Sequence, residues 1–357
     1  MTAAPSHADP ATPEPDGPMG SGPGPGDLAD QRAKALALLD EADEVCLACH
    51  VRPDADALGS MLAVAHALRA PGRRPQRVVA SFGDEPFEVP EILRFLPGLS
   101  LLSPPDAYPH RPELMVTFDA GSIDRLGILA GHASRADQLI VVDHHVSNTQ
   151  FGTVNLIDPG AAATAMLALD LIDAAGAGLT RDIAFGLYAG LVADTGSFKY
   201  SATTPAVHQA AARLLGTGIE PGTVARELWD RAPFGYLGLL SAVLGRAVLE
   251  PAAAAGHGLV WTSVSRADRS VHDLSLDAVE SVIDVVRHTD EAEVAIVLKQ
   301  SDDGLWQASA RSKGRVDVGR ACSSLGGGGH RNAAGVTLAG SAEDAIARLR
   351  GRLAESS

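Results

Sequence analysis

Short apolar runs alternate with amphipathic stretches along the first two thirds of the chain, a pattern typical of an α/β fold. The runs that we expect to form buried strands are Val45–Cys49, Arg77–Ser81, Glu113–Phe118, Leu139–Val142 and Val154–Ile157. Helices are predicted over Leu28–Ala42, Ala161–Ala175 and Arg181–Ala193. Strands that are apolar on both faces usually belong to a parallel sheet covered by helices on both sides. The pattern therefore predicts a doubly wound, mainly parallel sheet.

The alternation starts again near residue 250. Strands are predicted at Gly258–Ser265, Glu293–Lys299 and Leu305–Arg311, and helices at Leu276–His288, Asp317–Leu325 and Glu343–Leu353. We expect a first domain over residues 28–217, a helical linker over 218–249 and a smaller α/β domain over 250–357, with the active-site cleft between the two domains. Residues 1–27 are rich in Pro, Gly, Ala and acids without an apolar period, which predicts a disordered tail.

The composition argues against several classes of protein. The 357 residues carry a formal net charge of −15, and only 4% of them are aromatic. Binding to long duplex nucleic acid needs clustered Lys and Arg, and a platform for long single strands needs many aromatic rings. One small anion held by a metal and a few cations remains compatible. The first 27 residues lack the features of a signal peptide and no stretch reaches membrane-spanning length, so we expect a cytoplasmic protein without membrane contact.

The strongest chemical signal lies where the apolar segments end. The polar residues at these ends are His50, Asp54, Asp56, Asp119, Asp143, His144, His145 and Asp194. In a doubly wound sheet such ends can meet along one edge. Several of these residues have an ordinary interpretation as well: Asp54 as a helix N-cap, Asp119 as a cap after a strand, and the adjacent histidines as structural residues. Their occurrence in four separate segments favours a shared site.

Several carboxylates packed together would repel one another, whereas divalent cations would stabilise the cluster. Mixed oxygen and imidazole ligands suit manganese better than magnesium or calcium, with cobalt or zinc as alternatives. Two such cations are the usual means of polarising a phosphoryl group and ionising a water. The pattern predicts hydrolysis of a phosphate ester or phosphoanhydride.

A second candidate site lies in the smaller domain. SARSKGR at 309–315 and GGGGHRN at 326–332 supply glycines, a histidine and several cations. Glycine N–H groups can point at an anion, and Arg311 could contact a phosphate through two hydrogen bonds. The alternatives are a flexible glycine hairpin and a solvated basic face. The coincidence of these features favours substrate capture.

Five segments resemble the motifs of one known family. HVRPDAD at 50–56, TFDAG at 117–121, VVDHH at 141–145 and ADTGSF at 193–198 are similar to the four motifs of the DHH phosphoesterases. GGGGH at 326–330 is similar to the signature of the DHH-associated C-terminal domain. The full set of motifs, with its opening His-x3-Asp-x-Asp, is most similar to the bacterial nanoRNase/pAp phosphatase branch. The resemblance implies a DHH catalytic domain and a DHH-associated substrate-binding domain.

The resemblance also implies roles for individual residues. One manganese ion would be held by His50, Asp54 and Asp119, and a second by Asp56, Asp119, His144 and Asp194. His145 would face the scissile phosphate as a donor and candidate acid, and Asp143 would orient a histidine. The residues expected to contact substrate are Arg311, Gly328, Gly329, His330, Asn332 and Arg125. Two Mn²⁺ ions per subunit are implied, with Co²⁺ or Mg²⁺ as substitutes.

The substrates that the resemblance implies are short oligoribonucleotides and nucleotide bisphosphates. That branch degrades RNA of a few nucleotides and removes the 3′-phosphate from pAp, and its relatives hydrolyse cyclic di-AMP or pApA. A homodimer is compatible with the sequence. The alternatives are a pyrophosphatase, which shares the motifs of the first domain, and a nucleotide-binding regulator without catalysis.

Overall fold

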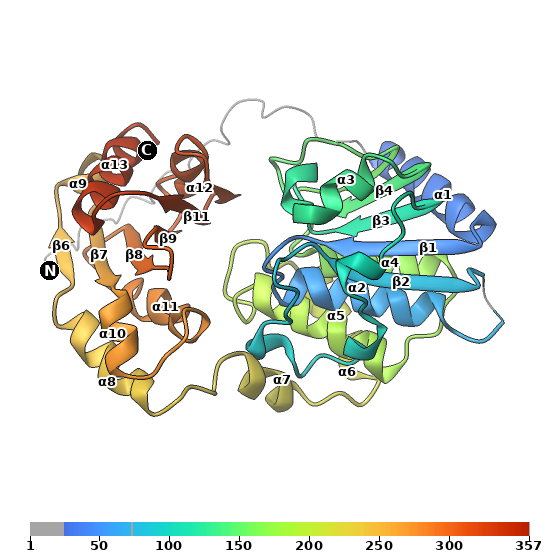
Figure 1. Cartoon of the computed structure of the whole chain (residues 1–357), viewed down its shortest axis with the longest axis horizontal. Helices are drawn as coiled ribbons and strands as arrows, with labels where there is room; N and C mark the ends of the chain where they lie inside the picture. Colours follow the sequence, from blue (N-terminus) through green and yellow to red (C-terminus); the bar gives the residue numbers. More distant parts are fainter. Residues whose placement is uncertain (1–24, 73, 357) are drawn as a thin grey trace, which may run out of the picture.

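The computed structural model describes residues 25–72 and 74–356, which form two α/β domains side by side (Figure 1). The sequence predicts a disordered tail over residues 1–27, and residues 1–24 of this segment lie outside the described residues. Its last three residues open a helix, α1 (Pro25–Glu41). Among the described residues, no helix has the length and apolar character needed to cross a membrane.

The first domain contains a five-stranded sheet in which every strand pair is parallel. Its strands are β1 (Glu44–Cys49), β2 (Arg77–Phe82), β3 (Leu114–Phe118), β4 (Gln138–Asp143) and β5 (Val154–Ile157), in the order β2-β1-β3-β4-β5. The predicted parallel sheet is confirmed. Successive residues of each strand enter opposite cores, as Val45 and Cys46 do, which explains the uninterrupted apolar runs.

Helical segments cover both faces of this sheet (Figure 1). One core contains α1 together with α2 (Ala55–Leu68), α4 (Thr164–Ala174), α5 (Arg181–Asp194) and α6 (Pro205–Leu215). The other core contains the 3-10 helix η4 (Ile123–Leu129) and α3 (Ala130–Ala133). The sheet is therefore doubly wound, as predicted.

Helices α2 and α5 approach each other to backbone contact. A Cβ atom on Gly59 of α2 would lie 2.4 Å from the carbonyl oxygen of Gly186 on α5. A Cβ on Gly190, one turn further along α5, would lie 2.6 Å from Asp56 Oδ1. Any larger residue would push the helices apart. This close approach brings the start of α2, with Asp56, beside the end of α5, with Asp194.

The second domain contains a six-stranded mixed sheet in the order β10-β11-β9-β8-β7-β6. Its strands are β6 (Val248–Glu250), β7 (Leu259–Val264), β8 (Val294–Gln300), β9 (Trp306–Ser312), β10 (Gly328–His330) and β11 (Ala333–Leu338). Helices α12 (Val318–Ser323) and α13 (Ala342–Ala354) pack on one face, and α8 (Gly235–Leu244) and α11 (Val282–Val286) on the other.

Three segments differ from the sequence prediction. The segment predicted as a helical linker contains two short helices, α7 (Pro221–Leu228) and α8, and its last residues belong to β6. The predicted helix Leu276–His288 is reduced to the 3-10 helix η5 (Asp277–Val279) and α11, in a stretch rich in β-branched residues. The glycine stretch is not a loop throughout: its second half pairs with β11 as an edge strand. The domain boundaries stay a prediction.

Candidate active site

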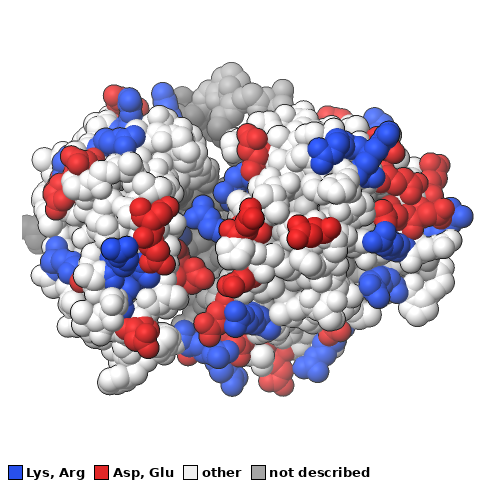
Figure 2. Space-filling view, in the orientation of Figure 1, with Lys and Arg blue, Asp and Glu red and all other residues white. Residues whose placement is uncertain are grey.

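The candidate site lies where the strand order of the parallel sheet reverses, between β1 and β3. Ligands of doubly wound sheets bind at the carboxyl ends of the strands at such a point. His50 follows β1 and Asp119 follows β3, while β4 ends in Asp143. In the space-filling view, a groove runs between the two domains with acidic and basic side chains along it (Figure 2).

Asp119 lies at the centre of the cluster. Its Oδ2 is 3.5 Å from His50 Nε2, and its Oδ1 is 3.5 Å from His144 Nε2. Its backbone is left-handed, with φ +57°, a conformation that Asp tolerates better than most residues. Among the described residues, three groups of potential metal ligands share this carboxylate, and within each group one donor atom per residue lies within 4.8 Å of the others. The groups are His50, Asp54 and Asp119; Asp56, Asp119 and His144; and Asp119, Asp143 and His145.

The two side-chain oxygens of Asp54 point in different directions. Oδ1 caps helix α2 by accepting hydrogen bonds from the backbone N–H groups of Asp56 and Ala57, each at 3.0 Å. Oδ2 lies 3.7 Å from His50 Nε2. The helix-cap interpretation and the ligand interpretation of this residue are therefore compatible.

Asp56 is a fully buried carboxylate at the start of α2. It accepts hydrogen bonds from the backbone N–H of Thr164 at 2.6 Å and of Ala165 at 2.9 Å, at the amino end of α4. Burial raises the pKa of Asp56 well above its usual range, and the negative charges of Asp194 and Asp119 raise it further. A cation bound among these three carboxylates would remove that repulsion.

Two histidines direct Nε2 towards the cluster. His50 Nδ1 lies 2.9 Å from the carbonyl oxygen of Val51, and His144 Nδ1 lies 3.2 Å from that of Ala161. A carbonyl can only accept, so each Nδ1 carries a hydrogen, and Nε2 is the nitrogen that would bind a cation after giving up its own proton, as in metal-bound histidines. His144 Nε2 is buried without a hydrogen-bond partner among the described residues. The donors therefore fit divalent cations.

Asp194 is the last residue of α5 and lies beside His144. Its Oδ2 is 3.1 Å from His144 Nε2, although the two are not aligned as a hydrogen bond. Burial raises the pKa of Asp194 to about 6, against the opposing effect of the imidazole. Burial disfavours a charged ring, but the adjoining carboxylates outweigh it and raise the pKa of His144 to about 11. The sequence predicted that a positive group would compensate the charge of an acid at this helix end, and the imidazole of His144 supplies part of that charge.

His145 is held by Asp143. His145 Nδ1 lies 2.7 Å from Asp143 Oδ1, and the other carboxylate oxygen accepts a hydrogen bond from Asn148 Nδ2 at 2.5 Å. Asp143 is completely buried. Burial opposes a charged ring, but the hydrogen bond to Asp143 and the charge of Asp119 raise the pKa of His145.

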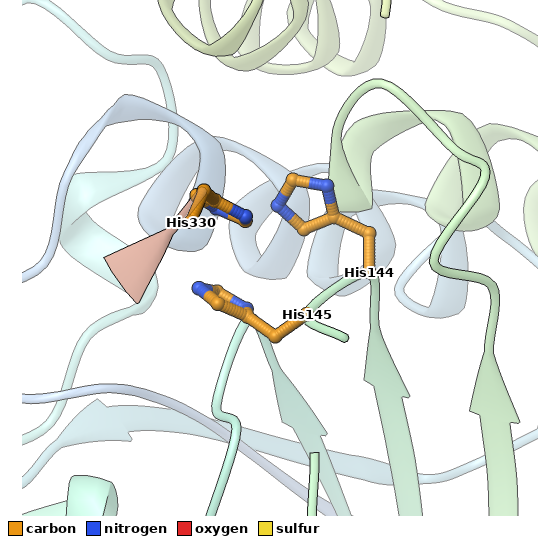
Figure 3. A group of neighbouring side chains, drawn as sticks. All are labelled: His144, His145 and His330. Carbon is orange, nitrogen blue, oxygen red and sulfur yellow. The ribbon is translucent and has the colours of Figure 1, made fainter. Parts of the chain in front are cut away.

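The second domain reaches the site through His330, at the end of β10. Figure 3 shows the three rings of His144, His145 and His330 facing one another. The ring of His330 stacks on that of His145 with centroids 4.4 Å apart and lies 4.9 Å from that of His144. Burial and the charges of His145 and His144 lower the pKa of His330 to about 4, so this ring is neutral at neutral pH.

The other residues expected to contact substrate lie at different distances from the cluster. Arg125 Nη2 is 3.4 Å from His50 Nδ1, at the edge of the cluster. Arg311 and His330 both align with Ala333 of β11, so Arg311 lies two strands from His330, roughly 10 Å across the sheet. Asn332 lies in the turn between β10 and β11, and its Oδ1 is buried without a hydrogen-bond partner among the described residues.

Gly328 and Gly329 lie in strand β10, where the sequence predicted a glycine loop. Gly328 and Gly329 pair with Gly335 and Ala334 of β11, so part of the backbone is used in the sheet. A Cβ on Gly329 would lie 2.5 Å from the carbonyl oxygen of Ala333, whereas a Cβ on Gly328 would meet nothing within 4 Å. Gly329 therefore lets β10 lie close against its neighbour, and both glycines remain exposed at the edge of the sheet.

Sequence reasoning missed two residues that hold the acids in place. The Thr164 hydroxyl donates a hydrogen bond to Asp119 Oδ1 at 2.8 Å. Asn148 binds Asp143 and also the carbonyl oxygen of Ala120. Asn148 stands five positions after Asp143, a weak signal. Thr164 offers none, because it lies far along the chain at the start of an apolar helix.

Comparison with known proteins agrees with this geometry. Residues 44–191 match the DHH family N-terminal domain, and residues 265–355 match the DHHA1 domain. The chain is 32% identical over 321 residues to the bifunctional oligoribonuclease and PAP phosphatase NrnA of Thermus thermophilus, covering 90% of this chain and 92% of that protein. It is 25% identical to the probable protein of the same name from Streptococcus mutans, covering 87% and 94%.

A solved structure shares the fold. An exopolyphosphatase-related protein from Bacteroides fragilis matches with a TM-score of 0.80 at 21% identity, covering 92% of this chain and 96% of that one. With a relative above 30% identity along almost its whole length and both domain models matched in order, the chain belongs to the DHH family of phosphoesterases and carries the DHHA1 domain.

Proposed function

We propose that the protein is a manganese-dependent phosphoesterase that hydrolyses short nucleotides: short RNA and pApA to mononucleotides, and pAp to AMP. The observation that carries this proposal is that Asp119 belongs both to the ligand group with His50 and Asp54 and to the ligand group with Asp56 and His144. The names of the Thermus thermophilus and Streptococcus mutans relatives support the substrate class. A short substrate also suits a chain with a net charge of −15, because binding a long nucleic acid needs a long basic channel.

We assign His50, Asp54 and Asp119 to one divalent cation and Asp56, Asp119, His144 and Asp194 to a second. Cations bound there would polarise the phosphoryl group and lower the pKa of an attacking water. Mn²⁺ suits this mixture of carboxylate and imidazole, with Co²⁺ or Mg²⁺ as substitutes. Two observations support this assignment: His144 Nε2 is buried without a hydrogen-bond partner among the described residues, and the neighbouring carboxylates repel Asp56.

His145 is the candidate acid for the leaving oxygen. Asp143 accepts from its Nδ1 at 2.7 Å, which leaves Nε2 free to donate a proton to the leaving group. His330, neutral and stacked on His145, can donate a hydrogen bond to the phosphate without adding charge. We therefore assign the reaction to the DHH domain and substrate capture to the second domain.

Arg311 would hold a second phosphate of the substrate. It shares a sheet face with His330 because paired residues of neighbouring strands point to the same side. Arg125, Asn332, Gly328 and Gly329 would complete the contacts to the nucleotide. A guanidinium two strands away from His330 favours short nucleotides that carry a phosphate at each end.

The test is a substrate panel with Mn²⁺ and the full chain: pAp, pApA, a short RNA, cyclic di-AMP and pyrophosphate, with products separated by chromatography. We expect mononucleotide release from pApA and loss of that activity in Asp119→Ala. Asp124→Ala is the matched control, because this exposed acid lies five positions away. Phosphate release from pyrophosphate but not from pAp would favour a pyrophosphatase. Tight cyclic di-AMP binding without turnover would favour a regulator. A homodimer and a cytoplasmic location remain predictions.

A further inference from the structure

The two domains meet at a second place, on the segment that follows α5. Arg287, next to the end of α11 in the second domain, donates a hydrogen bond from Nη1 to the hydroxyl of Tyr200 at 2.6 Å. Its guanidinium carbon also lies 5.1 Å from the centroid of the Tyr200 ring. The pair combines a charged hydrogen bond with a cation–π contact, and both side chains are partly buried.

Tyr200 belongs to a tight turn that starts directly after Asp194. Its backbone N–H donates to the carbonyl oxygen of Thr195 at 3.0 Å, so the two ends of the turn are tied together. Residues 196–198 are all left-handed, with φ between +56° and +64°. Two of these three residues are not glycine, and residues other than glycine keep a left-handed conformation only where surrounding contacts enforce it. Tyr200 therefore cannot move far without moving the residue next to Asp194.

The ring of Tyr200 lies directly on Gly196. A Cβ atom at position 196 would lie 2.3 Å from Cζ of that ring and 2.6 Å from its Cε atoms. The glycine thus lets the ring pack onto the turn, and the ring presents its hydroxyl to Arg287. A chain of contacts runs from the second domain through Tyr200 and Gly196 to Asp194.

We propose that Arg287 and Tyr200 form a clasp that holds the two domains closed and, through the turn at residues 195–200, fixes Asp194 against His144. Both are positioning residues, since neither contacts the reacting atoms. Closure also brings His330 onto His145, so one movement completes both halves of the site. The kinetic consequence rests on the proposed function, whereas the closure itself does not.

Losing the clasp shifts the free protein towards open forms. Substrate must then close the domains itself, and its apparent affinity falls by the fraction of molecules already closed. At saturation the substrate holds the domains together, so kcat changes little. Arg287→Ala removes both contacts and should raise KM for pApA about tenfold, which corresponds to about 1.4 kcal/mol. Tyr200→Phe keeps the ring and should have a smaller effect in the same direction.

Two measurements on the full chain with Mn²⁺ test the clasp: steady-state kinetics with pApA, and the radius of gyration from small-angle X-ray scattering without substrate. We expect a higher KM and a larger radius for Arg287→Ala, and likewise for Gly196→Ala, which keeps both clasp residues but displaces the ring. Arg348→Ala is the matched control, because it removes the same charge from an exposed position on α13.

Wild-type KM and radius in both Arg287→Ala and Gly196→Ala would overturn the proposal. A lower kcat with unchanged KM would overturn it as well, because that result would place Arg287 in the chemical step. If the wild-type chain does not hydrolyse pApA, the proposed function fails, and the radius of gyration still decides whether the clasp exists.

Discussion

Asp143 lies under His145 as a completely buried carboxylate, with Oδ1 2.7 Å from the Nδ1 of that ring. Its other oxygen is bound by Asn148. Both oxygens of Asp143 therefore act as acceptors, and the direction of the His145 ring depends on them. Because Nδ1 is held in this way, Nε2 is the nitrogen that can give up a proton.

Asp143→Asn should lower kcat for pApA by roughly a hundredfold with little change in KM. The amide has only one acceptor oxygen, so either His145 or Asn148 loses its partner. Steady-state kinetics would measure the effect, with circular dichroism to confirm the fold. A kcat within twofold of wild type would remove Asp143 as the residue that orients His145.

Thr164→Val should weaken Mn²⁺ binding by about 10-fold to 100-fold, because the valine cannot donate to Asp119. The substitution keeps the shape of the side chain, and the backbone N–H that binds Asp56 is retained. Isothermal titration of the metal-free protein with Mn²⁺ gives the affinity. Thr164→Ser keeps the hydroxyl and should restore binding; a weak-binding serine variant would contradict this role.

Gly186→Ala should destabilise the protein by about 1–3 kcal/mol, since its Cβ would lie 2.8 Å from the carbonyl oxygen of Gly59. Forcing α2 and α5 apart should also separate Asp56 from Asp194 and reduce activity. Urea unfolding measures the first effect. Gly222→Ala, where a Cβ meets nothing within 4 Å, is the control and should leave stability unchanged or slightly improved.

Mn²⁺ should raise the melting temperature, because it binds only the folded arrangement of the cluster. At a free Mn²⁺ concentration of about one hundred times Kd, the free energy of unfolding rises by about 2.7 kcal/mol. This gain raises the melting temperature by roughly 5–10 °C. Scanning calorimetry with Mn²⁺ and with a chelator would measure it. Asp119→Ala should lose the shift while Asp124→Ala keeps it. Identical melting curves with and without Mn²⁺ would argue against a metal site.

The parallel sheet and the acid and histidine cluster could be predicted from the sequence because each uses a local signal. A buried strand such as Leu114–Phe118 is a continuous apolar run, and a charged residue directly after it stands out. The carboxyl ends of the strands then meet along one edge, as in doubly wound sheets generally. Four separate segments gave the same signal, and the structure brings all of them together.

The residues that sequence reasoning missed act through distant contacts. Thr164 reaches Asp119 across 45 positions, and Arg287 reaches Tyr200 across 87. A threonine or an arginine in a helical stretch is unremarkable until the fold shows what it touches. The strand that contains Gly328 and Gly329 was not predicted, for a related reason. Glycine permits both loops and close strand packing, and only the position of β11 decides between them.

The left-handed backbone of Asp119 bears on how an intact nucleotide could be trapped for crystallography. Asparagine shares the tolerance of aspartate for this conformation, whereas alanine does not. Asp119→Asn would remove the charge while leaving the strand end relaxed. It is therefore the better choice than Asp119→Ala for co-crystals with uncleaved substrate.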